Sequence, residues 1–354
     1  MSITLQNSFL KGVIEGFYGR PWSFETRLAY AAYLPQLGLD AYLYCPKADS
    51  YLRKRWHQAW PADEFQQLAA LSKAYSERAL HFGVGLSPFA LYQNYGAKQR
   101  VLLRRKVEEI NALEAPLLAI LFDDMPGDLD DLAGRQCEII ADIQAWSTAR
   151  RVLVCPTYYS FDPVLEKYFG SMPGDYWSQL GAGLGDDVDI FWTGNEVCSN
   201  AVSVADIQKI QGQLGRRVVL WDNYPVNDGA QRSNFLYGTK LASREAGLGK
   251  VLRGHFCNPM NQGLVSLLAL QGLAELYGGV KVDEGLVREL WGAQAYDQFM
   301  GDLDNFQQLG LSGLGHSRCD DLSQLYEKMS GPAAQEVARW LRGEYTFDPA
   351  CLTD

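Results

Sequence analysis

The sequence predicts an α/β protein, a (β/α)8 TIM barrel followed by a small C-terminal helical domain. Eight short apolar runs alternate with longer amphipathic stretches up to about residue 277, which is the pattern of repeated βα units. The chain has 354 residues, enough for a barrel of about 250 residues and an appendage. Beyond residue 278 the spacing of apolar residues stays helical and strand-like runs are missing.

The eight predicted strands are residues 12–18, 41–45, 82–86, 117–122, 152–155, 188–192, 218–221 and 251–256. The predicted helices are residues 24–37, 63–80, 98–113, 136–146, 176–180 (a weak pattern), 204–214 and 264–277. A doubly wound open sheet is the alternative, but it more often has about five to seven strands and a glycine-rich first turn. The first turn here, EGFYGRPW, lacks the GxGxxG pattern, which favours the barrel.

The C-terminal region is predicted to contain helices at residues 282–309, 320–329 and 332–341. The segment GLSGLG, residues 310–315, is a natural break between two of them. The expected division is therefore a catalytic barrel at 1–278 and a helical domain at 279–354. We expect the helices either to pack against the barrel or to supply the surface of a homodimer.

Composition excludes several classes of function. A net charge of −10 argues against nucleic acid or an anionic membrane as the main partner. No apolar run approaches the roughly 20 residues that span a bilayer, and the N-terminus MSITLQNSFLKG does not resemble a signal peptide. The seven cysteines lack CxxC spacing, so reduced thiols are expected. Together these features favour a cytoplasmic protein, and the four scattered histidines predict no metal site.

The stretch LLAILFDDMPGD, residues 117–128, leads an apolar strand into the adjacent carboxylates Asp123 and Asp124. Two neighbouring ionised carboxylates repel, which pushes one of them toward holding its proton. No lysine or arginine stands beside them in the sequence. An acidic turn or a calcium loop are the alternatives, although the D-x-D-x-D order of a calcium loop is missing. The pair is a candidate for acid–base chemistry.

Other polar residues also follow the predicted strands, where a barrel of this type places its active site. The strand ends carry Glu15-Gly16-Phe17-Tyr18, Cys45-Pro46-Lys47-Ala48-Asp49, Pro156-Thr157-Tyr158-Tyr159, Trp192-Thr193-Gly194-Asn195, Trp221-Asp222-Asn223 with Asn227-Asp228 just beyond, and Cys257-Asn258-Pro259. Taken singly, the lysine is compatible with a solvated loop, the asparagines with turn caps and the tryptophan with core packing. Their coincidence at one mouth instead favours a hydroxyl-rich ligand, because amides and carboxylates bind hydroxyl groups while aromatic rings cover C–H surfaces.

Seven segments make the resemblance to a known family specific. They are GVIEGFYGRPW (12–22), YLYCPKAD (42–49), LFDDM (121–125), CPTYY (155–159), WTG (192–194), WDNYPVND (221–228) and NP (258–259). In this order they resemble glycoside hydrolase family 84, the family of O-GlcNAcases and related bacterial β-N-acetylglucosaminidases. The resemblance covers about residues 10–275; the C-terminal region contributes little to it.

The resemblance implies a retaining hydrolase that cleaves terminal β-linked N-acetylglucosamine without a cofactor. The substrate's own acetamido oxygen attacks the anomeric carbon and gives an oxazoline, an exception to the scheme of two enzyme carboxylates. Asp123 is then expected to polarise the acetamide N–H, and Asp124 to act as general acid and later as general base. Because successive residues of a strand face opposite sides, the pair is expected where strand gives way to loop.

The resemblance also assigns the substrate contacts one by one. They are the acetamide-pocket groups Tyr159 and Asn223, the 3-hydroxyl contacts Gly16 and Lys47, the 4- and 6-hydroxyl contacts Asp228 and Asn258, and the aromatic floor Trp221. Tyr159 is preferred to Tyr158 by alignment of CPTYY.

The aglycone is not readable from the sequence. An O-GlcNAc-modified protein, a glycan and a small glycoside all remain open as partners. Two alternative functions remain open. One is a barrel that binds N-acetylated sugar without cleaving it, and the other is a related enzyme that acts on a longer polymer such as chitin or hyaluronan. The presence of both Asp123 and Asp124 counts against the non-hydrolytic reading.

Overall fold

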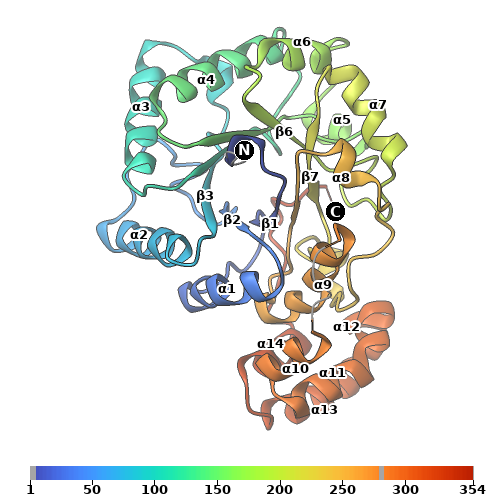
Figure 1. Ribbon diagram of the computed structural model, residues 1–354. Coiled ribbons are helices and arrows are strands. Elements are labelled where there is room, and N and C mark those ends of the chain that lie inside the picture. The colour runs from blue at the N-terminus through green and yellow to red at the C-terminus, as the bar shows by residue number, and fades with distance from the viewer. Residues whose placement is uncertain (1–4, 279–282, 354) are drawn as a thin grey trace.

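The structure is a computed structural model that describes residues 5–278 and 283–353 (Figure 1). Eight parallel strands close into a barrel in the order β1 to β8, which confirms the predicted fold class. The strands are β1 (Leu10–Glu15), β2 (Ala41–Tyr44), β3 (His81–Leu86), β4 (Leu117–Leu121), β5 (Arg151–Cys155), β6 (Val188–Trp192), β7 (Val218–Asp222) and β8 (Gly254–Cys257). Their sequences read as nearly continuous apolar runs because helices cover the outer face while side chains fill the interior.

Helices surround the barrel on the outside (Figure 1). They are α1 (Phe24–Gln36), α2 (Ala62–Ser76), α3 (Ala97–Asn111), α4 (Leu132–Trp146), α5 (Val164–Phe169), α6 (Tyr176–Gly183), α7 (Val204–Leu214), α8 (Leu248–Val251) and α9 (Gly263–Leu276). Short 3₁₀ turns lie at η1 (Leu5–Asn7), η2 (Leu91–Asn94) and η3 (Arg232–Asn234). Local signals fix several ends: Ser203 and Asp206 form a capping box at the start of α7.

Three predicted elements differ from the observed ones. Strand β1 ends at Glu15 rather than at residue 18, so that Gly16 and Tyr18 already belong to the loop at the barrel mouth. Strand β8 begins at Gly254 because residues 248–251 form the helical turn α8. The weak helix predicted at 176–180 is the second of two short helices, α5 and α6.

The helical character of the C-terminal region is confirmed, with different breaks. Its elements are α10 (Glu284–Trp291), α11 (Ala293–Asp304), the π-helical segment η4 (Asn305–Leu309), α12 (Gly310–Leu314), α13 (His316–Glu327) and α14 (Pro332–Leu341). The predicted 282–309 helix is divided at Gly292, whose φ of +82° favours glycine. The predicted break at 310–315 contains the short helical turn α12, and the left-handed glycines Gly310 (φ +63°) and Gly315 (φ +75°) separate it from η4 and α13. Residues 279–282, which include the predicted domain boundary and the predicted helix start, lie outside the described residues, so the domain division stays a prediction.

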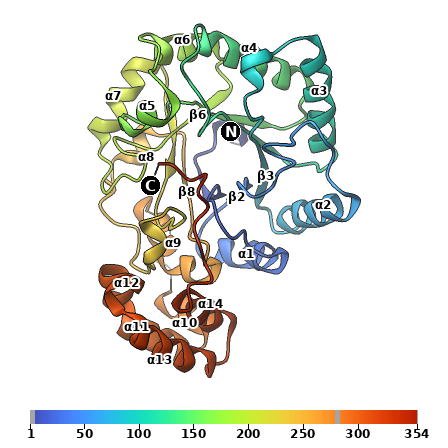
Figure 2. The same cartoon turned by 180° about the vertical axis from the view of Figure 1, so that it is seen from behind.

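The C-terminal helices pack against α9, the last helix of the barrel (Figure 1). The buried carboxylate of Glu336 accepts hydrogen bonds from the N–H groups of Leu264 and Val265, at 2.8 and 3.1 Å, and so caps the first turn of α9. Trp291 Nε1 donates to the carbonyl of Leu264 at 3.1 Å. Beyond α14 the chain turns back toward the barrel, as the darkest red segment of Figure 2 shows. None of the helices in the described residues is long and apolar enough to cross a membrane.

Candidate active site

A pocket of ≈ 490 Å³ opens at the carboxyl ends of the strands. All nine residues singled out in the sequence line it: Gly16, Lys47, Asp123, Asp124, Tyr159, Trp221, Asn223, Asp228 and Asn258. The remaining lining residues are Tyr18, Cys155, Thr193, Val197, Cys198, Val226, Arg232, Cys351 and Thr353. The roles given to the nine residues stay predictions, but the fold brings them to one place.

Asp123 and Asp124 both face this pocket because the backbone changes direction between them. Strand β4 ends at Leu121, and Asp124 adopts φ = +55°, the left-handed conformation that non-glycine residues seldom take. Without that change, two successive residues of a strand would point to opposite faces. One oxygen of Asp123, Oδ1, is buried and has no hydrogen-bond partner among the described residues.

Two cations from the loop after β2 lie against the carboxylate pair. The ammonium of Lys47 forms an ion pair with Asp123 Oδ2 and lies 3.6 Å from Asp124 Oδ2. The guanidinium of Arg53 donates to the backbone carbonyl of Asp124 at 3.3 Å. Burial alone would lower the pKa of Lys47, but the two carboxylates raise it above its ordinary value, so the lysine is charged.

Two tyrosine hydroxyls hold the Asp124 carboxylate. Tyr159 donates to Oδ1 at 3.0 Å and Tyr18 donates to Oδ2 at 2.8 Å. Burial would raise the pKa of Asp124, yet the two nearby cations and the two hydroxyls together hold this pKa below its ordinary value. The expectation that mutual repulsion keeps one proton on the pair in the unbound site is therefore wrong for Asp124. The sequence does not place cations beside the pair; the fold supplies them.

The two tyrosines of the CPTYY segment, Tyr158 and Tyr159, lie in different environments. Tyr159 lines the pocket. The hydroxyl of Tyr158 donates instead to the carbonyl of Gly170 at 2.6 Å, outside the pocket. The two adjacent side chains therefore point in different directions.

The opposite wall is built from the ends of β1, β7 and β8. Asn258 Nδ2 donates to Asn223 Oδ1 at 3.0 Å, while Asn258 Oδ1 accepts from the N–H of Gly16 at 3.2 Å. Trp221 Nε1 also donates to Asn223 Oδ1, at 2.9 Å. A Cβ on Gly16 would lie 2.4 Å from Cζ2 of Trp221, so only glycine allows the β1 backbone to approach the indole ring. Asp228 joins the same wall, its Oδ2 accepting from the Tyr18 N–H at 2.7 Å.

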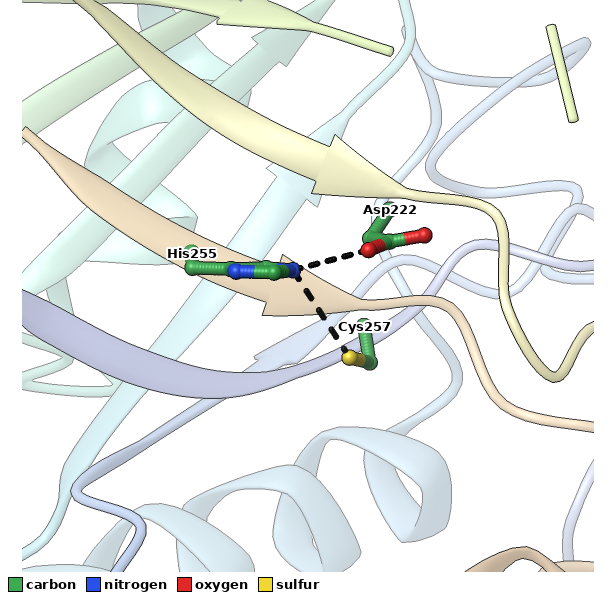
Figure 3. A group of neighbouring side chains, drawn as sticks. All are labelled: Asp222, His255 and Cys257. Atoms are coloured by element: carbon green, nitrogen blue, oxygen red, sulfur yellow. Dashed lines mark hydrogen bonds and ion pairs between the residues drawn. The ribbon is translucent and has the colours of Figure 1, made fainter. Parts of the chain in front are cut away.

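A second polar cluster lies behind this wall. Figure 3 shows Asp222, His255 and Cys257, the one group with metal-ligand spacing in the described part of the chain. His255 Nε2 lies 3.0 Å from Asp222 Oδ2 and 4.0 Å from Cys257 Sγ. Arg244 donates to both oxygens of the Asp222 carboxylate, at 2.7 and 2.6 Å. Because a guanidinium already occupies both oxygens, we interpret the cluster as a buried ion-pair network rather than as a metal site.

Several residues in or beside the pocket received no role from the sequence. Tyr18 stands at the end of the first predicted strand, two residues after Gly16, but no role was assigned to it. Arg53 lies six residues beyond Lys47, with nothing local to mark it. Cys351 and Thr353 belong to the C-terminal region, which contributed none of the residues assigned a role from the sequence. They reach the pocket because the segment after α14 returns to the mouth of the barrel (Figure 2).

The fold and the pocket together define a (β/α)8 barrel of the sugar-binding class, with a carboxylate pair, amides, hydroxyls and an aromatic ring converging at the strand ends. A family model described as beta-N-acetylglucosaminidase matches residues 11–291. The chain therefore belongs to this family, glycoside hydrolase family 84, as its sequence segments indicated.

Comparison with individual proteins agrees. The protein O-GlcNAcases of Rattus norvegicus and Mus musculus are each 31% identical to this chain over 288 residues, covering 78% of it. The chain spans only 31% of the length of either relative. The structure of a mutant O-GlcNAc hydrolase from Thermobaculum terrenum superposes with a TM-score of 0.71 at 24% identity, covering 96% of this chain and 82% of that one. The structure titled CpGH84B gives a TM-score of 0.73 at 22% identity, covering 95% and 66%. The two structural similarities support the fold.

Proposed function

We propose that the protein is a retaining β-N-acetylglucosaminidase that hydrolyses terminal β-linked N-acetylglucosamine by substrate-assisted catalysis. The observation that carries this proposal is the buried Oδ1 of Asp123, which has no donor among the described residues. A buried acceptor requires a hydrogen-bond donor. The acetamide N–H of the substrate is such a donor, and it reaches Asp123 when the sugar lies between the carboxylate pair and Trp221.

The reaction follows from this placement. As Asp123 accepts the N–H hydrogen bond, electron density moves to the acetamide oxygen, which attacks the anomeric carbon. The bond from that carbon to the leaving oxygen breaks while Asp124 gives the leaving oxygen a proton. Water then attacks the same carbon of the oxazoline, Asp124 takes the proton from that water, and the ring opens to the β-anomer of the sugar.

The charge state of the pair has to change when the sugar binds. In the unbound site the low pKa of Asp124 favours its carboxylate form. We propose that a bound sugar draws the Lys47 ammonium toward its 3-hydroxyl group and excludes water from the pocket. Both changes raise the pKa of Asp124, because the carboxylate loses a cation and its solvation. The acid is thus formed in the complex.

The decisive test is a series of substrates whose acetamido hydrogens are replaced by fluorine. Each fluorine weakens the acetamide oxygen as a nucleophile and leaves the aglycone unchanged, so kcat should fall progressively and the first product should be the β-anomer. A stable thiazoline analogue of the intermediate should bind far more tightly than free sugar. A flat response to fluorine, or an α-anomer as first product, would exclude substrate assistance.

Two competing functions are separated by a simpler assay. A barrel that only binds the sugar would bind N-acetylglucosamine without turning over any aryl β-N-acetylglucosaminide. An enzyme for a longer polymer would prefer chitin or hyaluronan oligomers to that aryl glycoside. Testing the galactosamine and glucose analogues beside it shows whether the acetamide and the 4-hydroxyl group are both required.

The natural substrate is proposed to be an O-GlcNAc-modified protein. The two mammalian relatives are named protein O-GlcNAcases, which supports this choice. No disulfide joins the cysteines of the described residues, which fits the proposed cytoplasmic location, where thiols stay reduced. Release of N-acetylglucosamine from a modified protein, compared with release from a glycan, tests the substrate. A homodimer through the C-terminal helices stays a prediction that light scattering can check.

A further inference from the structure

Arg53 lies where it can fix the unusual backbone of Asp124. Its guanidinium spans two acceptors, the carbonyl of Asp124 at 3.3 Å and Oγ of Ser87 at 3.2 Å. The residue is 7% exposed, and the rings of Tyr18 and Phe89 lie 5.8 and 5.2 Å from its central carbon. The planar fork of arginine presents its donors in a fixed geometry, whereas the ammonium group of lysine is a compact charge on a flexible stem.

A left-handed non-glycine residue persists only where its surroundings hold it. In Asp124 the two carboxylate oxygens are bound by tyrosine hydroxyls, and the carbonyl is bound by Arg53. We propose that Arg53 is a positioning residue: it fixes the left-handed turn that aims Asp124, beside Asp123, into the pocket. This positioning role depends on the proposed function in one respect only, because the proposed function names the reaction in which Asp124 takes part. The charged and titratable groups that face Asp124 are Asp123, Lys47, Arg53, Tyr18 and Tyr159.

The test compares Arg53→Lys and Arg53→Met with Arg55→Met, an exposed arginine on the same segment that lies outside the pocket. For aryl glycosides with poor leaving groups, Arg53→Lys should lower kcat by roughly tenfold or more, since general acid catalysis contributes roughly 10²–10⁴-fold. For good leaving groups the loss should be small, and KM should change little. Equal losses for both kinds of leaving group, or full activity in Arg53→Lys, would overturn the proposal.

A measurement that does not need substrate turnover tests the positioning role of Arg53 independently of the proposed enzymatic activity. The titration of the Asp124 carboxyl carbon can be followed by ¹³C NMR in the unbound protein. Arg53→Met removes a positive charge and should raise the pKa of Asp124; Arg53→Lys should change it less. An unchanged Asp124 titration in Arg53→Met would overturn the proposal. Absence of hydrolysis in the unaltered protein would overturn the proposed function instead.

A second and independent observation concerns residues 344–353, here called the strap. The strap begins at an anchor: Tyr345 is buried, and the guanidinium of Arg20 lies 5.4 Å from its ring. Residues 346–350 are exposed, and a turn follows in which the N–H groups of Ala350 and Cys351 both bond to Asp348. Figure 2 shows this segment crossing the barrel face to the C-terminal label.

The tip of the strap enters the candidate active site. Cys351 and Thr353 line the same pocket as the carboxylate pair. The side chain of Thr353 lies close enough to Tyr159, whose hydroxyl also holds Asp124, to oppose the rise that burial causes in the pKa of that hydroxyl. We infer that the strap is a displaceable competitor, which occupies part of the sugar pocket until substrate displaces it. The exposed linker makes this contact easy to break, since few buried groups hold it.

The inference about the strap rests on the proposed function, because the proposed function identifies the ligand that competes with the strap as a sugar substrate. A variant that ends after Phe347 keeps the Tyr345 anchor and removes the tip. Because the apparent affinity is reduced by the fraction of open pockets, removal of the tip should lower KM for an aryl β-N-acetylglucosaminide by about threefold or more at unchanged kcat. Thr353→Val should act in the same direction, and Leu352→Ala, an exposed neighbour outside the pocket, should not. An unchanged or higher KM would overturn the strap's role as competitor.

A readout without sugar keeps the two proposals apart. Cys198 lines the pocket and is half-buried, so iodoacetamide should alkylate it faster once the tip is removed. The rate can be measured peptide by peptide with mass spectrometry. Equal rates in both chains would overturn occlusion by the strap whatever the enzyme's activity. Faster alkylation in a protein that hydrolyses no substrate would support occlusion of the pocket by the strap and would reject the proposed function.

Discussion

Tyr18 and Asp124, which lie 106 residues apart in the sequence, are joined by a hydrogen bond of 2.8 Å from the tyrosine hydroxyl to the carboxylate. The same tyrosine donates its backbone N–H to Asp228. One residue of the β1 loop therefore contacts both the predicted acid and a predicted hydroxyl-binding carboxylate. This connection makes the acidity of Asp124 depend on a residue outside its own strand.

Tyr18→Phe should raise the pKa of Asp124, because it removes a hydrogen bond that stabilises the carboxylate. Activity on the basic side of the pH profile depends on protonated Asp124. The basic limb of kcat/KM should therefore move to higher pH in this variant. Tyr158→Phe is the matched control, since that hydroxyl bonds to a backbone carbonyl outside the pocket. A limb that stays in place would show that Tyr18 has no influence on the acid.

The two members of the carboxylate pair should respond differently to amide substitution. Asp124→Asn should slow substrates with poor leaving groups by roughly 10²–10⁴-fold and activated aryl glycosides much less, because a good leaving group needs little protonation. Asp123→Asn should slow both alike, since it weakens closure of the oxazoline ring. Steady-state rates over a series of aryl glycosides measure this. The opposite pattern would exchange the two roles.

The pH profiles of kcat/KM and kcat should differ on the basic side. The first reports the unbound enzyme, in which the pKa of Asp124 is held low by its cations and hydroxyls. The second reports the complex, in which the proposed movement of Lys47 raises that pKa. The basic limb of kcat should thus lie at higher pH than that of kcat/KM. Coincident limbs would argue that substrate does not change the charge state of the pair.

Removing Arg244 should destabilise the fold strongly. Asp222 is buried, and its carboxylate is held by Arg244 and His255, which together keep its pKa below the ordinary value against the effect of burial. Arg244→Met leaves that charge without its main partner, at a cost of about 3–5 kcal/mol in the free energy of unfolding. Arg288→Met breaks the exposed pair with Asp297 and should have little effect. Urea denaturation compares the two variants, and similar losses would contradict the importance of the buried network.

Glu336 should make stability depend on pH. Burial raises its pKa from 4.5 to about 7, despite two hydrogen bonds from the start of α9. Between these values the folded protein holds a proton that the unfolded chain has released, so the contribution of Glu336 to stability is fully present below about pH 4.5 and is lost as pH rises toward 7. The contribution is on the order of 1–3 kcal/mol. Glu336→Gln should flatten this part of the curve of Tm against pH. An unchanged slope would show that other groups cause the pH dependence of stability.

Much of the fold was predictable because its signals are local. Each strand of the barrel is buried on both faces, so an apolar run such as residues 117–121 marks it directly. The start of β8 was misplaced by three residues, because the apolar Val251, taken as the first residue of the strand, ends the helical turn α8. Periodicity alone does not separate such short segments.

The sequence by itself determined which side chains stand at the carboxyl ends of the strands, because parallel strands of a barrel bring those ends to one face. The nine residues that the family resemblance selected among them all line one pocket. Only the tertiary structure decided what surrounds the carboxylate pair. Tyr18, Arg53 and Thr353 reach the site of Asp124 from the β1 loop, the β2 loop and the C-terminal segment. Such contacts depend on loop conformation and on closure of the barrel, and neither leaves a periodic signal in the chain.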